Sequence, residues 1–329
     1  MKSIKFLLFS SLILIAGCGG GDDDTNTTAQ SQGTITTPEE AKAVVAGFFG
    51  ALDFGDNVGN SAGNLVTQAN RVHGFGFHKR LLNIYGKYVP KGNSLGALQT
   101  VQEYTCDESG TYTVEEIGNL SYKITFINCV SLGTTMNGVL VISAVDENNN
   151  NIPEEITFTL KQGFSAESVD EAFEAKGDFT LSMKGLNNGD LFDNNQNIRG
   201  TLTYQEGPIY FEDRQENKWV EIGFSNFSVA LDEVNGTASF SGGITYKDNF
   251  CKTSQVSLSF NTIQEFKLSS AECPYAGKLS INNGLITLES HDPDNDPMTE
   301  NYMRIYFNNT EIFNDVCTNF TPPQSCGGG

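Results

Sequence analysis

The sequence predicts a mainly β protein, a large twisted antiparallel sheet with an N-terminal helical segment. Three observations support this. Apolar residues alternate with polar ones in repeated short runs after residue 100, turn motifs separate these runs, and helical spacing of apolar residues is confined to the first third of the chain. The patterns leave open whether the sheet is a sandwich, a barrel or a curved half-barrel.

The helical segment is expected between residues 36 and 98. Thr37 suits an N-cap, Pro38 suits the first helical position, and Glu40 is placed to complete a capping box. Apolar residues then recur at three- and four-residue spacing to about residue 53. A second apolar stretch, residues 75–88, is expected to be helical in part.

The region 99–329 is expected to form an antiparallel β domain of roughly a dozen strands. In Leu120–Phe126, for example, every second residue is apolar, which gives the strand one apolar and one polar face. One insert, Ala166–Lys176, is expected to hold a short helix. Four dipeptides are expected to be tight hairpin turns, because Asn and Gly tolerate the positive φ that such turns need. They are Asn137-Gly138, Asn235-Gly236, Asn283-Gly284 and Asn308-Asn309.

A loose internal repeat runs through this region. Ile124–Val141 and Ile222–Ser239 both follow the order strand, Asn, loop, Asn-Gly and strand.

The N-terminus carries an export signal. Lys2 and Lys5 supply positive charge, and residues 6–15 form an apolar run that is too short to span a bilayer comfortably. Ala16 and Gly17 then precede Cys18.

This arrangement resembles the lipobox of bacterial lipoproteins. The resemblance implies that residues 1–17 are removed and that Cys18 is acylated on its thiol and its new amino group, which anchors the chain in a membrane. Gly19 stands where an aspartate commonly retains family members in the inner membrane, so the outer membrane is expected. Residues 18–35 are rich in Gly, Asp, Thr and Ser and are expected to form a flexible acidic tether.

Six cysteines remain after Cys18, and an even number in an exported chain indicates disulfides. Sequence cannot choose rigorously among the possible pairings. Neighbour spacing suggests three pairs: Cys106–Cys129, Cys251–Cys273 and Cys317–Cys326. The pattern around Cys106, Gly110, Cys129 and Gly138, and the stretch Cys273–Gly277, are similar to uncharacterised β-rich bacterial lipoproteins, a resemblance that implies no activity.

The charge balance narrows the possible partners. The chain has 20 Lys and Arg against 40 Asp and Glu, and removal of Lys2 and Lys5 with the signal leaves a net charge of −22. Such a surface disfavours nucleic acid and anionic lipid.

Three acidic or amide-rich stretches are candidate Ca²⁺ loops, because alternate oxygen ligands begin such loops. In the first stretch the predicted ligands are Asp292, Asp294, Asp296 and Glu300. In the second they are Asp146, Asn148 and Asn150. The third, weaker stretch holds Asp193, Asn195 and Asn197. The glycine at position six is replaced by Pro297 in one loop and by Asn151 in the other. Plain turns, which favour the same residues, remain the alternative.

Catalytic motifs are weak. Gly59–Gly63 matches G-x-S-x-G, but a nucleophile elbow needs a preceding buried strand in an α/β sheet, and the surrounding pattern does not supply one. The chain has only three histidines, among them His73 and His78.

The expected function is therefore non-catalytic: a lipid-anchored outer-membrane protein with a structural, adhesive or protein-interaction role. No cofactor is expected beyond weakly bound calcium. One alternative is a carrier or sensor of a hydrophobic ligand, which would need an apolar cavity beneath the N-terminal helix. An enzyme of unrecognised type is the other.

Overall fold

The computed structural model describes residues 35–42, 45, 77–88, 101–192, 197–214, 217–248, 256–268, 274–293 and 302–316. It shows a mainly β protein in which all sixteen strands belong to one antiparallel sheet. The elements in chain order are α2 (Phe77–Tyr88), β1 (Gln102–Thr105), β2 (Ser109–Gly118), β3 (Ser121–Ser131), β4 (Thr134–Val145), β5 (Glu155–Leu160), β6 (Ser165–Glu167), β7 (Glu171–Ala175), β8 (Phe179–Gly185), the 3-10 turn η1 (Leu186–Asn188), β9 (Arg199–Asp213), β10 (Lys218–Asp232), β11 (Thr237–Asp248), β12 (Val256–Lys267), β13 (Ala276–Ile281), β14 (Ile286–His291), β15 (Tyr302–Phe307) and β16 (Thr310–Val316).

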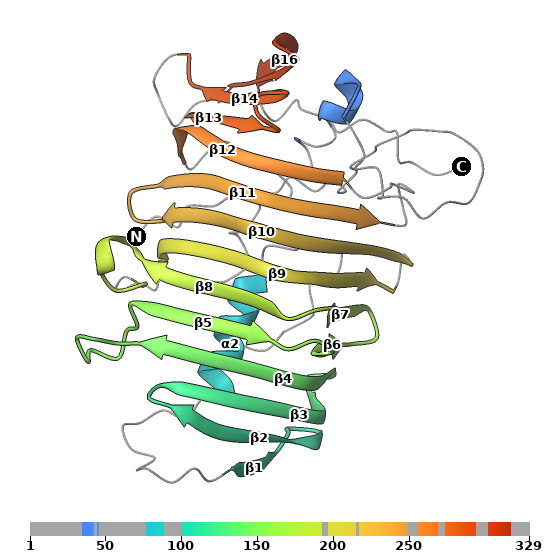
Figure 1. Ribbon diagram of the computed structural model, residues 1–329, viewed down its shortest axis with the longest axis vertical. Helices are drawn as coiled ribbons and strands as arrows, with labels where there is room; N and C mark the ends of the chain where they lie inside the picture. The colour runs from blue at the N-terminus through green and yellow to red at the C-terminus, as the bar shows by residue number, and fades with distance from the viewer. Residues whose placement is uncertain are drawn as a thin grey trace.

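The sheet is an open meander. Its order follows the sequence from β1 to β16, and Figure 1 shows these two strands at opposite ends of the molecule's longest axis. Neighbours in space are therefore mostly neighbours in sequence, joined by short connections as expected for antiparallel strands.

One excursion interrupts the meander. β5 pairs with β8, while β6 and β7 form a hairpin that bridges β4 to β9 beyond the ends of β5 and β8. The expected short helix at Ala166–Lys176 is therefore wrong. Phe173 and Ala175 are buried whereas Glu174 between them is not, so the segment has the alternation of a strand, and pairing with β9 overrides its helix-forming residues.

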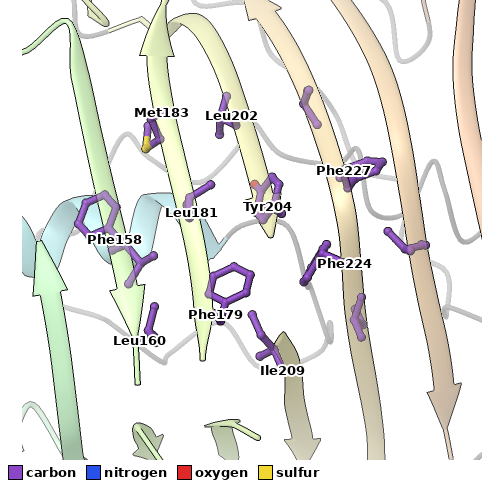
Figure 2. Packing of buried hydrophobic residues seen from close by; sticks show 14 of the residues in the cluster. Phe158, Leu160, Phe179, Leu181, Met183, Leu202, Tyr204, Ile209, Phe224 and Phe227 are labelled. Carbon is purple, nitrogen blue, oxygen red and sulfur yellow. The ribbon is translucent and has the colours of Figure 1, made fainter. Parts of the chain in front are cut away.

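The hydrophobic core lies on one face of the sheet. Strands such as β5 and β8 bury every second side chain. Figure 2 shows the resulting layer, in which Phe158, Leu181, Tyr204 and Phe227 from four strands stand side by side. Because each of these four side chains is at most 2% exposed, this face supplies most of the apolar burial that stabilises the fold.

Helix α2 lies behind the sheet in Figure 1, and its last residue, Tyr88, packs on the inner face at β2 and β3. Its Leu81, Ile84 and Tyr88 are buried, and the Tyr88 ring lies 4.9 Å from that of Tyr112 and 5.3 Å from that of Phe126. The expected helix within residues 75–88 is thus confirmed. Earlier in the chain, residues 38–42 are helical.

The predicted capping box at this first helix is also present. The Thr37 backbone N–H donates to Glu40 Oε2 at 3.0 Å, and the Glu40 backbone N–H donates to Thr37 Oγ1 at 3.2 Å. The expected end of the helix near residue 53 lies outside the described residues.

The opposite, outer face is polar, with cross-strand ion pairs such as Lys123–Glu115 and Lys278–Glu289 as well as uncharged side chains. One row of hydroxyl and amide side chains crosses eight strands, each directly paired with the next: Ser121, Ser143, Thr157, Ser182, Thr203, Ser228, Ser241 and Asn261. Several of these hydroxyls bond to one another, as in Thr203–Ser228 at 2.9 Å. Such cross-strand pairs stabilise the sheet.

Two β-bulges account for the first asparagine that the two copies of the internal repeat share. Asn128 in β3 and Asn226 in β10 both have positive φ, and each lies opposite a glycine, Gly110 or Gly242, in the neighbouring strand. A Cβ at Gly110 would lie 1.9 Å from the Asn128 carbonyl oxygen, and a Cβ at Gly242 would lie 2.0 Å from that of Asn226. This asparagine therefore marks a bulge, and a side chain is excluded at the facing glycine, which lies outside the repeat.

Three of the four expected turns are confirmed. The β10–β11, β13–β14 and β15–β16 connections contain positive-φ residues at Gly236, at Asn283-Gly284 and at Asn308-Asn309.

The fourth expected turn is wrong, because Asn137-Gly138 lies inside β4. The β3–β4 turn is instead Leu132-Gly133, with φ of 52° and 70°. Glycine is required at position 138 for another reason, because a Cβ there would lie 2.6 Å from the Phe164 Cα.

The Cys106–Cys129 disulfide is present and joins β3 to the segment before β2. The other suggested pairs, Cys251–Cys273 and Cys317–Cys326, lie outside the described residues.

Candidate functional site

Charged and amide side chains gather in the loops at one end of the strands, which is called this edge of the sheet below. In an antiparallel meander, alternate connections fall on the same edge. The β4–β5 loop (residues 146–154), η1 with the residues after it, and the β10–β11 turn (residues 233–236) therefore lie along one edge, on the left in Figure 1. We name this group the strand-end loops.

The β4–β5 loop is held by its own side chains. Asp146 accepts backbone N–H groups of Asn150 at 3.2 Å and Asn151 at 3.0 Å, and Asn150 Oδ1 accepts the N–H of Ile152 at 2.7 Å. Asn151 has a φ of 66°, which asparagine tolerates. The predicted Asp146, Asn148 and Asn150 are thereby brought together.

Glu154 and Asp190 complete this group. Asn148 Nδ2 donates to Glu154 Oε1 at 2.6 Å and to Asp190 Oδ1 at 2.8 Å, while Asn150 Nδ2 donates to Asp190 Oδ2 at 2.7 Å. Glu154 is only 9% exposed. Asp190 was missed by the sequence reading, because it is 42 residues from Asn148 and no local pattern links it to the loop.

Asp232 anchors the β10–β11 turn. Its carboxylate accepts the backbone N–H groups of Val234 and Asn235 at 3.1 and 2.9 Å, and the Asn235 side-chain amide at 2.7 Å. Arg199 Nε lies 3.4 Å away. Burial raises the pKa of Asp232, but the Asn235 hydrogen bonds, the Arg199 charge and the Val234 N–H outweigh it and lower the pKa below its ordinary value.

A cavity of about 460 Å³ opens between η1, β9 and the β10–β11 turn. Its volume falls within the range of small-ligand pockets. Ile152, Leu186 and Phe192 supply apolar lining, and the charged lining comes from Asp190, Arg199 and Asp232, with Gly189 and the amides Asn187 and Asn235 between them.

Metal binding at the strand-end loops would need amide and backbone oxygens. Among the described residues, no group of three or more His, Cys, Asp or Glu side chains is arranged to hold a metal ion. Asp146, Glu154 and Asp190 nevertheless bring carboxylate oxygens, a ligand type that Ca²⁺ takes, to the same loop, whereas Asn148 and Asn150 turn their Nδ2 groups toward Asp190.

The second predicted calcium loop is separate from this site. Asp292 follows β14, while Asp294, Asp296 and Glu300 lie outside the described residues. Several other predicted residues also lie outside the described residues: Cys18, Cys251, Cys273, Cys317, Cys326, the G-x-S-x-G stretch at 59–63, His73, and Asp193 and Asn195 of the third acidic stretch. His78 falls in α2.

The cavity is not lined by α2 residues, and the hydrophobic-carrier alternative, which needs an apolar cavity beneath the N-terminal helix, stays a prediction. The α2 residues Leu81, Ile84 and Tyr88 are buried in the hydrophobic core, and Tyr88 contacts Phe126 of β3. Within the described ranges, no helix combines the length and apolarity needed to cross a bilayer.

Comparison with known proteins finds that the chain is similar to an uncharacterised bacterial protein. An uncharacterised protein of Aquifex aeolicus (strain VF5) is 34% identical over 316 residues, an alignment that covers 90% of this chain and 89% of the relative. No family model matches the chain. No solved structure matches it either.

Proposed function

The chain belongs to the same family as the uncharacterised Aquifex aeolicus protein, and we propose that it is a non-catalytic, lipid-anchored protein of the outer membrane that binds a protein partner through its strand-end loops. The observation that carries this proposal is one cavity whose charged and amide lining comes from separate parts of the chain: Asn187 and Asp190 at η1, Arg199 in β9, and Asp232 and Asn235 at the β10–β11 turn.

Charge supports a binding role for this edge. The strand-end loops carry Asp146, Glu147, Glu154, Asp190 and Glu233, and Asp232 ends β10 beside them. Arg199 is the basic residue that lines the cavity. Complementary charge steers association and sets specificity more than it adds affinity. The outer face of the described sheet offers a different surface, in which a row of hydroxyls that partly bond to one another lies among cross-strand ion pairs such as Lys247–Glu221.

The test is site-specific photo-crosslinking in intact cells. A photoreactive amino acid at the exposed Asn187 should crosslink to a protein partner, and the crosslink should be lost when Glu147 and Asp190 are both changed to Lys. The control is the same amino acid at Ser241 on the outer face. Crosslinks from Ser241 but none from Asn187 would contradict the proposal.

Calcium binding by the β4–β5 loop is a second candidate role. It is favoured by the way Asp190 joins Asp146, Asn148, Asn150 and Glu154. A cation that binds only the folded state stabilises it by mass action. Millimolar calcium should therefore raise the Tm of the full chain by a few degrees.

The control for calcium is a charge-matched pair of variants. Asp190→Asn should abolish the calcium-dependent rise in Tm, whereas Asp315→Asn on β16 should retain it. An unchanged Tm in the wild-type chain would rule out this role.

A further inference from the structure

We propose that the strand-end cavity receives a Lys or Arg side chain from the partner, so that the partner presents a basic segment to this edge of the sheet. This deepens the proposed function and rests on it. Three observations favour a basic side chain as the occupant of the cavity: Asp190 has no cationic partner within the described part of the chain, apolar residues line the cavity beside it, and the surroundings are acidic.

Asp190 lines the cavity as a carboxylate without a cation. Both of its oxygens accept hydrogen bonds, but the donors are the neutral amides of Asn148 and Asn150. Among the described residues, no Lys, Arg or His nitrogen lies within 4.0 Å of it. Asp232 differs, since Arg199 lies 3.4 Å from its carboxylate.

The apolar lining suits the stem of a basic side chain. Ile152, Leu186 and Phe192 line the same cavity as Asp190. Lys and Arg bury their methylene stems along apolar surface while the charged head reaches a polar partner. A volume of about 460 Å³ accommodates one such side chain together with water.

The surroundings favour a cation over an anion. Glu154, which shares the Asn148 amide with Asp190, and Asp232, which lines the same cavity, add negative charge beside Asp190, and the chain as a whole has 40 acidic against 20 basic residues. A basic segment would therefore be attracted before contact, and the attraction would weaken as salt rises.

The test measures binding of fluorescent peptides to the detergent-solubilised full chain by anisotropy, at low salt and with a chelator present throughout. The probes are a repeating Lys-Gly peptide and a repeating Glu-Gly peptide. The Lys-Gly peptide should bind and the Glu-Gly peptide should not. Equal binding of both, or no binding of the Lys-Gly peptide, would overturn the proposal.

Two variants locate the contact. Asp190→Asn should weaken Lys-Gly binding by about tenfold, the loss expected for one charged hydrogen bond, while Asp315→Asn removes the same charge from β16 and should leave binding nearly unchanged. Equal weakening by both variants would show that binding depends only on total charge, which would overturn the proposal.

Arg199→Gln gives a result that misfolding cannot imitate. Removing this cation from the cavity should tighten Lys-Gly binding by about two- to fivefold, because it also frees Asp232. Weaker or unchanged binding would overturn the proposal. Crosslinking from Asn187 that survives Asp190→Asn would leave the proposed function in place and refute the basic side chain as the occupant.

Discussion

Single backbone positions decide whether neighbouring strands of this sheet can pair at their bulges. At Gly242 the chain has a φ of 89°, and a Cβ would lie 2.0 Å from the Asn226 carbonyl oxygen. Both the conformation and the space therefore require glycine. Gly133 has a similar φ of 70°, but a Cβ there would meet nothing within 4 Å.

This contrast gives a matched pair of substitutions. Gly242→Ala should lower the free energy of unfolding by about 2–3 kcal/mol, because backbone strain is added to a backbone clash. Gly133→Ala should cost about 1 kcal/mol, from backbone conformation alone. Urea unfolding followed by the fluorescence of Trp219, the only tryptophan, measures both. Equal losses would contradict the close approach at Gly242.

Asp232 links stability to pH. Its folded-state pKa is lower than the ordinary value of 3.8, so its contribution is fully present above that value and is lost as pH falls through the folded pKa. Asp232→Asn should therefore lower the free energy of unfolding by about 1–2 kcal/mol at neutral pH, and the difference should shrink below pH 3.8. The measurement is urea unfolding at both pH values. A difference independent of pH would contradict this account.

Residue-level predictions from the sequence succeeded where the interaction is local. The Thr37 and Glu40 capping box spans three residues, so its partners are visible in one short window. Asp146, Asn148 and Asn150 were likewise recognised as a group. Asp190 could not be, because only the pairing of β5 with β8 brings η1 beside the β4–β5 loop.

Elements were predicted reliably where their period is clear. The burial of every second residue in β3, β5 and β8 matches the apolar alternation in the sequence. Asn137-Gly138 failed as a turn because asparagine and glycine also suit a bulge, where Asn137 Oδ1 accepts the Asn128 N–H at 2.7 Å. Composition does not distinguish a turn from a bulge.

The disulfide is the covalent link among the described elements. Cys129 in β3 is fully buried, and the bond closes a 23-residue separation. Cys106→Ala and Cys129→Ala should each lower the free energy of unfolding by about 2–5 kcal/mol, chiefly because the unfolded chain gains freedom. Denaturant unfolding measures this loss. An unchanged midpoint in both variants would show that the bond contributes little.

At the scale of the whole molecule, the sequence predicts a large antiparallel sheet but leaves open whether it is a sandwich, a barrel or a half-barrel. Alternating strands and short loops imply antiparallel neighbours. They do not reveal that β6 and β7 leave the meander, because that pairing depends on β4 and β9, which are far apart in sequence. The contact of Asp190 with Asn148 and Asn150 likewise depends on a long-range pairing, that of β5 with β8.

The proposed lipid anchor at Cys18 can be tested on the full-length protein. Cys18 lies outside the described residues, and its acylation is inferred from the lipobox resemblance. Cys18→Ser should move the protein from the membrane pellet to the soluble fraction, because several acyl chains are needed for stable attachment. The control is Cys106→Ala, which should stay in the pellet. Continued pelleting of Cys18→Ser would contradict the anchor.

The order of strands also affects how such a protein changes over evolution. Because most strands bond to the strands before and after them in sequence, a hairpin added or lost between two turns lengthens or shortens the sheet without rerouting the remainder. The β4–β9 bridge is the exception, since β6 and β7 tie two distant strands together. We expect related chains to differ in hairpin number toward either end of the sheet and to keep the segment from β4 to β9 intact.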